Sequence, residues 1–159
     1  MQFGKSSMAK LNTCHRDLQT IMLESIKCTD VDFGITHGHR TPEEQFELFK
    51  QGRKLVNGKW IVEDYKKVVT DKDGFDNKSR HNQYPSHAVD IVAYVNGKYT
   101  WDKDHMLYLM GLVKGIANKL FIEGTVGHQI KNGANWDNDG EIIHDHTFID
   151  LPHFEIIWK

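Results

Sequence analysis

The chain has 159 residues with a formal net charge of −2, and 39% of its residues are hydrophobic while 26% are charged. This charge balance gives no electrostatic support for a nucleic-acid partner or an anionic membrane. No apolar run approaches the roughly 18 residues that a membrane span needs. The composition predicts one globular domain over residues 1–159 that binds no nucleic acid and does not insert into a membrane. We expect this domain to act as a monomer.

The first half of the sequence contains two helical patterns and one extended pattern. Apolar side chains recur at a helical spacing and predict a helix over residues 7–27; they are Leu11, Leu18, Met22 and Ile26. The segment VDFGIT predicts a short strand at 31–36. The segment TPEEQFELFKQG predicts a helix at 41–52, with Thr41 as its N-cap and Glu44 at the capping-box position.

The second half combines long polar segments with strong apolar patterns. Residues 53–86 are polar and rich in turn signals, so we expect a long irregular loop, which in a compact domain is usually functional or mobile. AVDIVAYV predicts a strand at 88–95, and helical spacing predicts a second long helix at 103–120. Residues 132–146 look like an acidic loop, and HFEIIW predicts a last strand at 153–158. This order predicts an α+β fold with helices packed on a small, mostly antiparallel sheet.

The two cysteines of the chain, Cys14 and Cys28, are expected to be reduced. Both fall within the helix predicted at 7–27, about four turns apart, so they could pair only if that helix were broken. They are also poor zinc ligands, because no further cysteine is present to complete a thiolate site.

Three residues in the second half of the chain form a plausible metal-ligand set. Asp90 lies inside the predicted strand at 88–95, where aspartate is disfavoured unless a cation or hydrogen bonds hold its carboxylate. His81 ends the loop before that strand, and His153 opens the last strand. Two histidines and one carboxylate are a common ligand set for catalytic zinc. Spacing alone is weak support, since a lone loop histidine is most often a surface residue.

The same segment resembles a motif of a known group of peptidases. The motif reads S-x-H-x-x-G-x-A-x-D, and Ser79, His81, Ala88 and Asp90 match it in order. The group comprises zinc peptidases that include D-Ala-D-Ala dipeptidases and carboxypeptidases as well as phage L-alanyl-D-glutamate endolysins. Two further segments fit the resemblance, which runs from about residue 31 to the C-terminus. The family has a carboxylate three residues before a histidine, as Asp150 and His153 are in DLPH, and GHRTPEEQFELFKQGR resembles its G-x-R-T segment.

The resemblance implies a role for each matched residue. It implies that His81, Asp90 and His153 bind one zinc ion and that Asp150 acts as the general acid–base group. It implies that Arg40 binds the carbonyl oxyanion or a carboxylate of the substrate.

One departure from the family motif leaves an alternative open. The family spacing from histidine to aspartate is seven, whereas His81 and Asp90 are nine apart, and Ser86 stands where the motif has glycine. Two additional loop residues cost little closure entropy, and Pro85 can hold the longer link rigid. His87 is the rival ligand if the alignment shifts, although residues 87 and 90 of a strand face opposite sides. Otherwise we assign His87, together with Ser79, to substrate binding.

Two other groups of polar residues are weaker candidates. The segment HGH places His37 and His39 beside Arg40, where they are better interpreted as cleft or surface residues than as a metal pair. The segment DNDG at 137–140, with Asp145 nearby, offers oxygen atoms that suit calcium. It lacks the complete twelve-residue loop with its final glutamate, so calcium is a secondary possibility.

The resemblance implies a zinc metallopeptidase that hydrolyses the stem peptide of peptidoglycan, most specifically an L-alanyl-D-glutamate endopeptidase acting as a phage endolysin. A D-Ala-D-Ala carboxypeptidase or dipeptidase is the alternative within the group. A different class also stays open, because the hedgehog signalling domain shares this fold and uses a similar zinc site mainly for binding. The first residues lack the apolar stretch of a signal peptide. We therefore expect the enzyme in the host cytoplasm until another factor, such as a holin, releases it to the wall.

Overall fold

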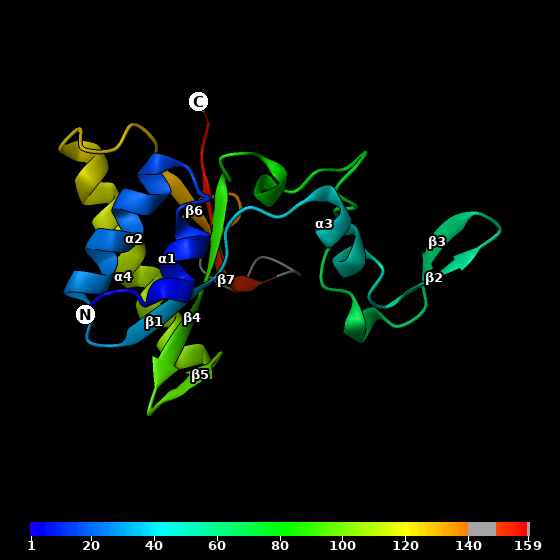
Figure 1. Ribbon diagram of the computed structural model, residues 1–159, viewed down its shortest axis with the longest axis horizontal. Helices are drawn as coiled ribbons and strands as arrows, with labels where there is room; N and C mark the ends of the chain where they lie inside the picture. The colour runs from blue at the N-terminus through cyan, green and yellow to red at the C-terminus, as the bar shows by residue number, and fades with distance from the viewer. Residues whose placement is uncertain (140–148, 159) are drawn as a thin grey trace.

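A five-stranded antiparallel sheet forms the centre of the computed structural model, which describes residues 1–139 and 149–158 (Figure 1). Four strands lie side by side in the order β1, β4, β7 and β6, and β5 pairs with β4. Their bounds are β1 Asp32–His37, β4 Ala88–Val95, β5 Lys98–Thr100, β6 Ile130–Gly133 and β7 Asp150–Ile156. The predicted α+β fold with an antiparallel sheet is confirmed.

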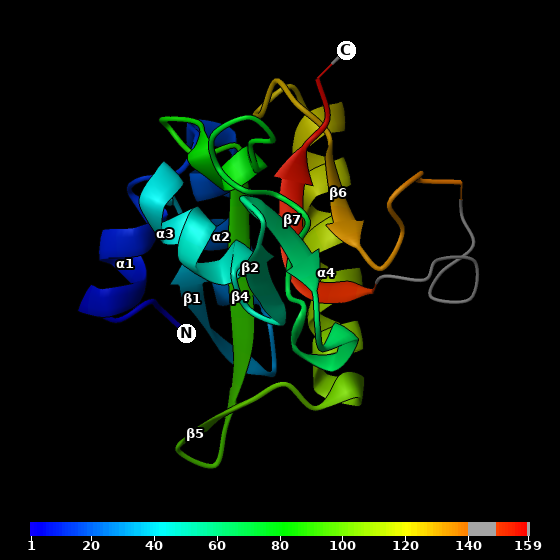
Figure 2. The same ribbon diagram turned by 90° about the vertical axis from the view of Figure 1, so that its right-hand side faces the viewer.

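Three helices cover one face of this sheet, and the other face is open toward a projecting arm (Figures 1 and 2). The helices are α1 (Lys5–Leu11), α2 (Arg16–Cys28) and α4 (Lys103–Ile122). Their apolar sides and the facing sheet residues form the core; its largest fully buried members include Leu18, Ile21, Ile91, Leu109, Ile130 and Phe154. Removing such side chains from water is the main force that holds the helices on the sheet.

The prediction of one continuous helix over residues 7–27 is wrong, because the chain forms two helices there. Residues between α1 and α2 pair instead with the loop before β4: Ser86 donates to the carbonyl of Thr13, and His15 donates to the carbonyl of Ser86. Cys14 therefore lies between the helices and is buried, while Cys28 ends α2 and is exposed. Both thiols are free, as predicted. Burial raises the pKa of Cys14 to about 12, so this thiol is unreactive.

The predicted loop at 53–86 contains a hairpin that the sequence reading missed. The strands β2 (Arg53–Val56) and β3 (Lys59–Val62) pair around an Asn57–Gly58 turn in which both residues have positive φ. This turn favours two-residue hairpins because its twist matches that of the strands. The hairpin follows α3 (Pro42–Phe49), and the two project from the body as an arm (Figure 1).

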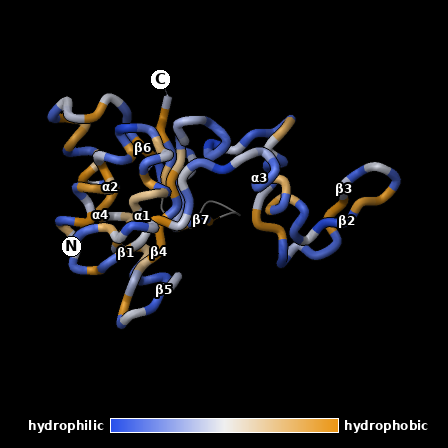
Figure 3. The backbone as a smooth tube through the Cα atoms, in the orientation of Figure 1, coloured by the Kyte–Doolittle hydropathy of each residue, from blue (hydrophilic) through white to orange (hydrophobic). Residues whose placement is uncertain are grey.

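The arm has a small hydrophobic cluster of its own. The ring of Phe46 lies 5.9 Å from Phe49, 5.8 Å from Trp60 and 5.8 Å from Phe75. Figure 3 shows this second group of hydrophobic positions, separate from the larger one in the body. The aromatic contacts hold α3 and the hairpin together.

The remaining elements agree well with their predicted bounds. The strand predicted at 88–95 matches β4, and the predictions at 31–36, 41–52 and 103–120 match β1, α3 and α4 within a few residues. The last strand begins at Asp150 rather than at 153, and the short strands β5 and β6 were not predicted. None of the helices within residues 1–139 and 149–158 has the length and apolar character that crossing a membrane requires.

Candidate active site

Three side chains converge on one point at the open face of the sheet. Asp90 in β4 and His153 in β7 are directly paired across the two strands. Oδ1 of Asp90 lies 3.0 Å from Nδ1 of His153 and 3.2 Å from Nε2 of His81, and the two nitrogens are 3.3 Å apart. A tetrahedral ion with bonds of about 2.0 Å separates its ligand atoms by roughly 3.3 Å, so these three atoms fit a metal ion.

His81 is held by a short turn and by the chain beside it. It lies in the 3-10 helix Arg80–Asn82, whose N-cap is Ser79; the hydroxyl of Ser79 accepts a hydrogen bond from the backbone N–H of His81. The ring is only 2% exposed, and its Nδ1 lies 2.7 Å from the carbonyl oxygen of Gly38. The carbonyl oxygen of Gly38 can only accept a hydrogen bond, so Nδ1 of His81 carries the proton. Nε2 of His81 keeps a lone pair that faces the ligand point, where the side chains of His81, Asp90 and His153 converge.

His153 is oriented by a carboxylate that the sequence reading did not assign to the site. Its Nε2 lies 3.1 Å from Oε2 of Glu155, which leaves Nδ1 to face Asp90. Burial opposes a charge on His153, but the hydrogen bonds to Asp90 and Glu155 raise its pKa to about 10. Histidine ligands of metals are commonly oriented by such an outer carboxylate. The sequence signal is the spacing in HFE, because alternate residues of a strand share a face.

Asp90 stays ionised and offers one oxygen to the ligand point. Burial by itself raises the pKa of Asp90, but His81 and the other neighbouring histidines outweigh it and hold this pKa well below its ordinary value. Its second oxygen, Oδ2, lies 3.5 Å from Nδ1 of His37 and 3.5 Å from Nη2 of Arg40. The carboxylate is therefore fixed from two sides in the form that binds a metal.

Arg40 is positioned by a buried glutamine. Nη1 of Arg40 donates to Oε1 of Gln45 at 2.7 Å, and Gln45, on α3, is fully enclosed. Burial lowers the pKa of Arg40, although Asp90 opposes this shift, and a guanidinium remains charged at neutral pH. The α3 capping box at Thr41 and Glu44 fixes the chain next to Arg40, so the cation has a defined place beside the ligand point.

Asp150 lies at the start of β7, opposite Gly133 in β6. Burial and the charge of Asp90 raise its pKa, although the nearby cationic groups oppose the shift. A side chain at Gly133 would collide with Asp150 and with the ring of Trp136, so only glycine permits this close approach. Trp136, which the sequence reading also missed, stands 5.4 Å from His153 between ring centres.

These side chains line one wall of a cleft of about 1010 Å³. The body contributes Arg40, His81, Asp90, Trp136, Asp150 and His153, and the arm with the segment after it contributes Leu48, Tyr65 and residues 68–72. A cleft of this size between two parts of a chain can hold an extended peptide, with the ligand point in its wall.

The description "Phage L-alanyl-D-glutamate peptidase" belongs to a family model that matches residues 1–157. The chain belongs to this family. No curated protein matches its sequence. Among solved structures, it is similar to the L-Ala D-Glu endopeptidase ChiX of Serratia marcescens, with a TM-score of 0.67 and 22% identity over 99% of this chain and 90% of that one. The predicted family and the predicted peptidoglycan-cleaving peptidase activity are confirmed.

In this peptidase, His87 lies outside the cleft. The ring of His87 packs 4.8 Å from Trp158 and 6.2 Å from His15, and His87 does not line the cleft. Burial lowers its pKa, and the nearby charges of His15 and Arg80 lower it further. The structure therefore does not bring His87 together with Ser79, which does line the cleft.

The longer link between His81 and Asp90 has a structural explanation in this peptidase. The hydrogen bonds of Ser86 with the connection between α1 and α2 hold the end of this link against the body. His37 contacts Asp90, whereas His39 packs against Tyr84 at 5.1 Å, so these two histidines form no metal pair. Of the proposed calcium ligands, Gly140 and Asp145 lie outside the described residues.

Replacing Glu155 with glutamine is expected to lower metal affinity and wall cleavage by about 10–100-fold. The amide keeps the size of Glu155 but offers His153 a neutral acceptor in place of a charged one, so the hydrogen bond that fixes the ring is weaker. Metal affinity is measured by competition with a chromogenic chelator. Glu63→Gln is the matched control, because Glu63 is exposed and pairs with Lys54 of the hairpin at 2.6 Å. Equal affinities of Glu155→Gln and the parent protein would contradict this role.

Proposed function

We propose that the enzyme cleaves the L-alanyl-D-glutamate bond of the peptidoglycan stem peptide with one zinc ion bound by His81, Asp90 and His153. The observation that carries the proposal is the triangle of two imidazole nitrogens and one carboxylate oxygen, with sides of 3.0–3.3 Å, in the wall of the cleft. Zinc is supported because three protein ligands of this kind leave a position for water or substrate, as in catalytic zinc sites.

The proposed reaction needs a proton acceptor beside the metal. When bound, zinc supplies Lewis acidity and lowers the pKa of a coordinating water molecule toward about 7. Asp150 is the proposed general base that takes the proton of the attacking water and later gives it to the leaving amine. Its support is its place in the cleft and its raised pKa, which brings a carboxylate closer to the range where it exchanges protons.

Arg40 is the proposed electrostatic partner of the substrate. Its guanidinium is held by Gln45 and faces the cleft, so it is preorganised before substrate binds. It can stabilise the negative charge that develops on the carbonyl oxygen, or bind a carboxylate of the stem peptide. Lys78 and Arg80 also line the cleft, and their charge suits the acidic D-glutamate residue. Ser79 contributes by fixing the turn that carries His81.

The proposed setting is the lysis of a bacterial host. Family membership supports a phage endolysin that acts on the host wall after another factor, such as a holin, releases it from the cytoplasm. We propose that it works as a monomer, because the ligand set and the cleft are complete within one chain.

The proposal is tested by digesting purified walls with and without a chelator. We expect mass spectrometry to find muropeptides that end in L-alanine and peptides that begin with D-glutamate. Cleavage should stop in the chelator and return when zinc is added. Release of free D-alanine in place of these fragments would support a carboxypeptidase, and cleavage that persists without metal would contradict the zinc site.

A further inference from the structure

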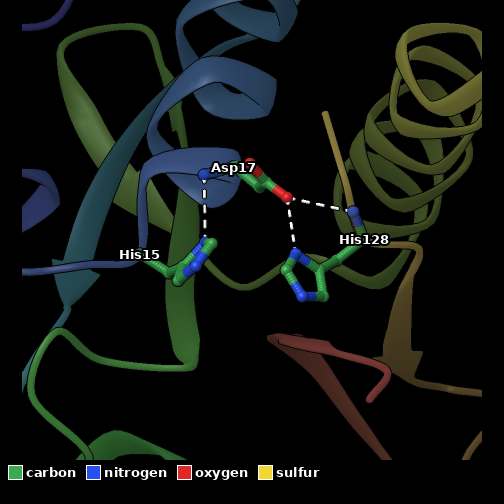
Figure 4. Close-up of side chains that lie close together, drawn as sticks. All are labelled: His15, Asp17 and His128. Atoms are coloured by element: carbon green, nitrogen blue, oxygen red, sulfur yellow. Dashed lines mark hydrogen bonds and ion pairs between the residues drawn. The ribbon is translucent and has the colours of Figure 1, made fainter. Parts of the chain in front are cut away.

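A group of two histidines and one carboxylate outside the cleft is satisfied by its own hydrogen bonds (Figure 4). Oδ2 of Asp17 accepts the backbone N–H of Gly127 at 2.9 Å and of His128 at 3.0 Å, and it lies 2.7 Å from Nδ1 of His128. Nδ1 of His15 accepts the backbone N–H of Asp17 at 3.2 Å. These bonds join the start of α2 to the segment before β6, so the group stabilises the fold and offers no common point to a ligand.

The cations that line the cleft differ in how far the chain itself engages them. Arg40 donates to Gln45 at 2.7 Å, and Lys72 donates to Asn77 at 3.2 Å. The side chain of Arg80 is 47% exposed, and its guanidinium donates a hydrogen bond to no acceptor in the part of the chain that the structure describes. The N–H groups of Arg80 are therefore available to a ligand in the cleft.

Arg80 is nevertheless held in place by its surroundings. Its carbonyl accepts the backbone N–H of His87 at 3.1 Å. Its Nε lies 3.9 Å from Oε1 of Glu155, which is beyond hydrogen-bond distance, so this ion pair orients the side chain without using its N–H groups. Glu155 is itself fixed by Lys131 at 3.5 Å and by His153 at 3.1 Å. The chain thus presents a positioned guanidinium to the cleft.

The position of Arg80 places it beside the ligand point. Arg80 directly precedes His81 in the chain, and its partner Glu155 contacts His153, so it borders two of the three proposed metal ligands. Lys78, two residues earlier, is exposed and also lines the cleft. A substrate group next to the scissile bond therefore lies close to both cations.

D-Glutamate brings a free carboxylate to this place. It has two carboxyl groups and only one continues the peptide, so the other lies free on the residue that supplies the leaving amine. Three carboxylates of the cleft, those of Asp90, Asp150 and Glu155, would repel this group unless a cation faced it. A guanidinium carries only N–H donors and binds a carboxylate through two parallel hydrogen bonds. An amide offers it one acceptor oxygen and turns N–H donors toward donors.

We propose that Arg80, assisted by Lys78, binds the free carboxylate of D-glutamate and makes the enzyme selective for stem peptides in which this carboxyl group is not amidated. The inference rests on the proposed function, because it takes the L-alanyl-D-glutamate bond as the bond that is cut. Arg80 is then a specificity-determining residue, whereas Arg40 serves the carbonyl oxygen on the other side of the scissile bond.

The test compares two substrates that differ only at this carboxyl group. One is a muropeptide with an intact L-alanyl-D-glutamate bond, and the other is the same muropeptide with the free carboxyl group of D-glutamate converted to an amide. We expect the parent protein to cleave the acid with a kcat/KM about 10–100-fold higher than that for the amide, as for a hydrogen bond to a charged group. The difference should appear mainly in KM, because the carboxylate is present before and during the reaction.

Arg80→Gln is expected to lower kcat/KM for the acid by about the same factor and to leave kcat/KM for the amide within about threefold. Arg80→Lys keeps the charge but loses the planar arrangement of N–H groups, so its preference should lie between those of the parent protein and Arg80→Gln. Arg16→Gln is the matched control, because Arg16 is exposed at the start of α2 and does not line the cleft. The ratio between the substrates is insensitive to metal loss, since metal loss lowers both rates equally.

Three results would overturn the inference. The first is a parent protein that cleaves acid and amide with equal kcat/KM. The second is an equal loss on both substrates in Arg80→Gln, which would mean that Arg80 only supports Glu155. The third is a preference that Arg80→Gln keeps and Lys78→Gln removes. In each of them the parent protein still cleaves the bond, so the proposed function stands. A parent protein that cleaves neither substrate would refute the proposed function, on which the inference rests.

Discussion

Replacing His153 with alanine is expected to remove the metal ion from the cleft and to lower wall cleavage by at least about 10³-fold. The metal supplies several kcal/mol of transition-state stabilisation, and each 1.36 kcal/mol is a factor of ten in rate. His153 is one of the three proposed ligands, and its ring lies between the carboxylates of Asp90 and Glu155, at 3.0 and 3.1 Å. Without the imidazole, these two buried negative charges lose their shared partner.

The measurement is the metal content after dialysis together with the release of new amino termini from purified walls. We expect one ion per chain fewer than in the parent protein. His105→Ala is the matched control, because it removes a half-buried histidine at the start of α4, outside the cleft, and should keep both metal and cleavage. Circular dichroism of the variant, compared with the chelated parent protein, separates metal loss from unfolding. A His153→Ala chain with the full metal content and normal cleavage would contradict the ligand assignment.

The three residues proposed as ligands could be picked out from the sequence because each lies in a short local pattern. Asp90 interrupts an apolar strand, and His81 and His153 fall in motifs that the family shares. The residues around the ligands were harder to find, since their role depends on which strands pair. Glu155 matters because β4 and β7 place Asp90 opposite His153. Trp136 lies at the site because its ring packs closely against Gly133, and no residue spacing in the sequence predicts that contact.

The fold shows the same division between local and long-range information. The apolar run at 88–95 gave the bounds of β4, because a strand buried in the centre of a sheet has a strong pattern. The strands β2 and β3 are largely exposed, so they carry no such pattern and were missed. The break between α1 and α2 was hidden because Leu11 and Leu18, seven residues apart, continue the helical period across it. The break becomes evident only in the structure, where Thr13 and His15 form backbone hydrogen bonds with Ser86.

Replacing Asp150 with asparagine is expected to lower wall cleavage by at least about 10²-fold while the protein keeps its fold and its metal. General acid–base groups typically contribute about 10²–10⁴-fold to a rate. Asparagine nearly preserves the volume of Asp150 in the narrow space beside Gly133, and it removes the ability to accept a proton at neutral pH. The proposed ligand set of His81, Asp90 and His153 does not include Asp150, so metal binding should be unaffected.

The variant is compared with Asp76→Asn, which makes the same chemical change at an exposed position after α3 and should leave cleavage within about twofold, as surface substitutions usually do. Metal content, melting temperature and released amino termini are measured for both. Loss of cleavage with metal retained assigns the proton transfer to Asp150, since a purely structural role would lower the melting temperature as well. If Asp150→Asn cleaves walls as fast as the parent protein, the base is another carboxylate. Glu155 is then the first alternative, because it also lines the cleft, although its bonds to His153 and its ion pair with Lys131 already occupy it.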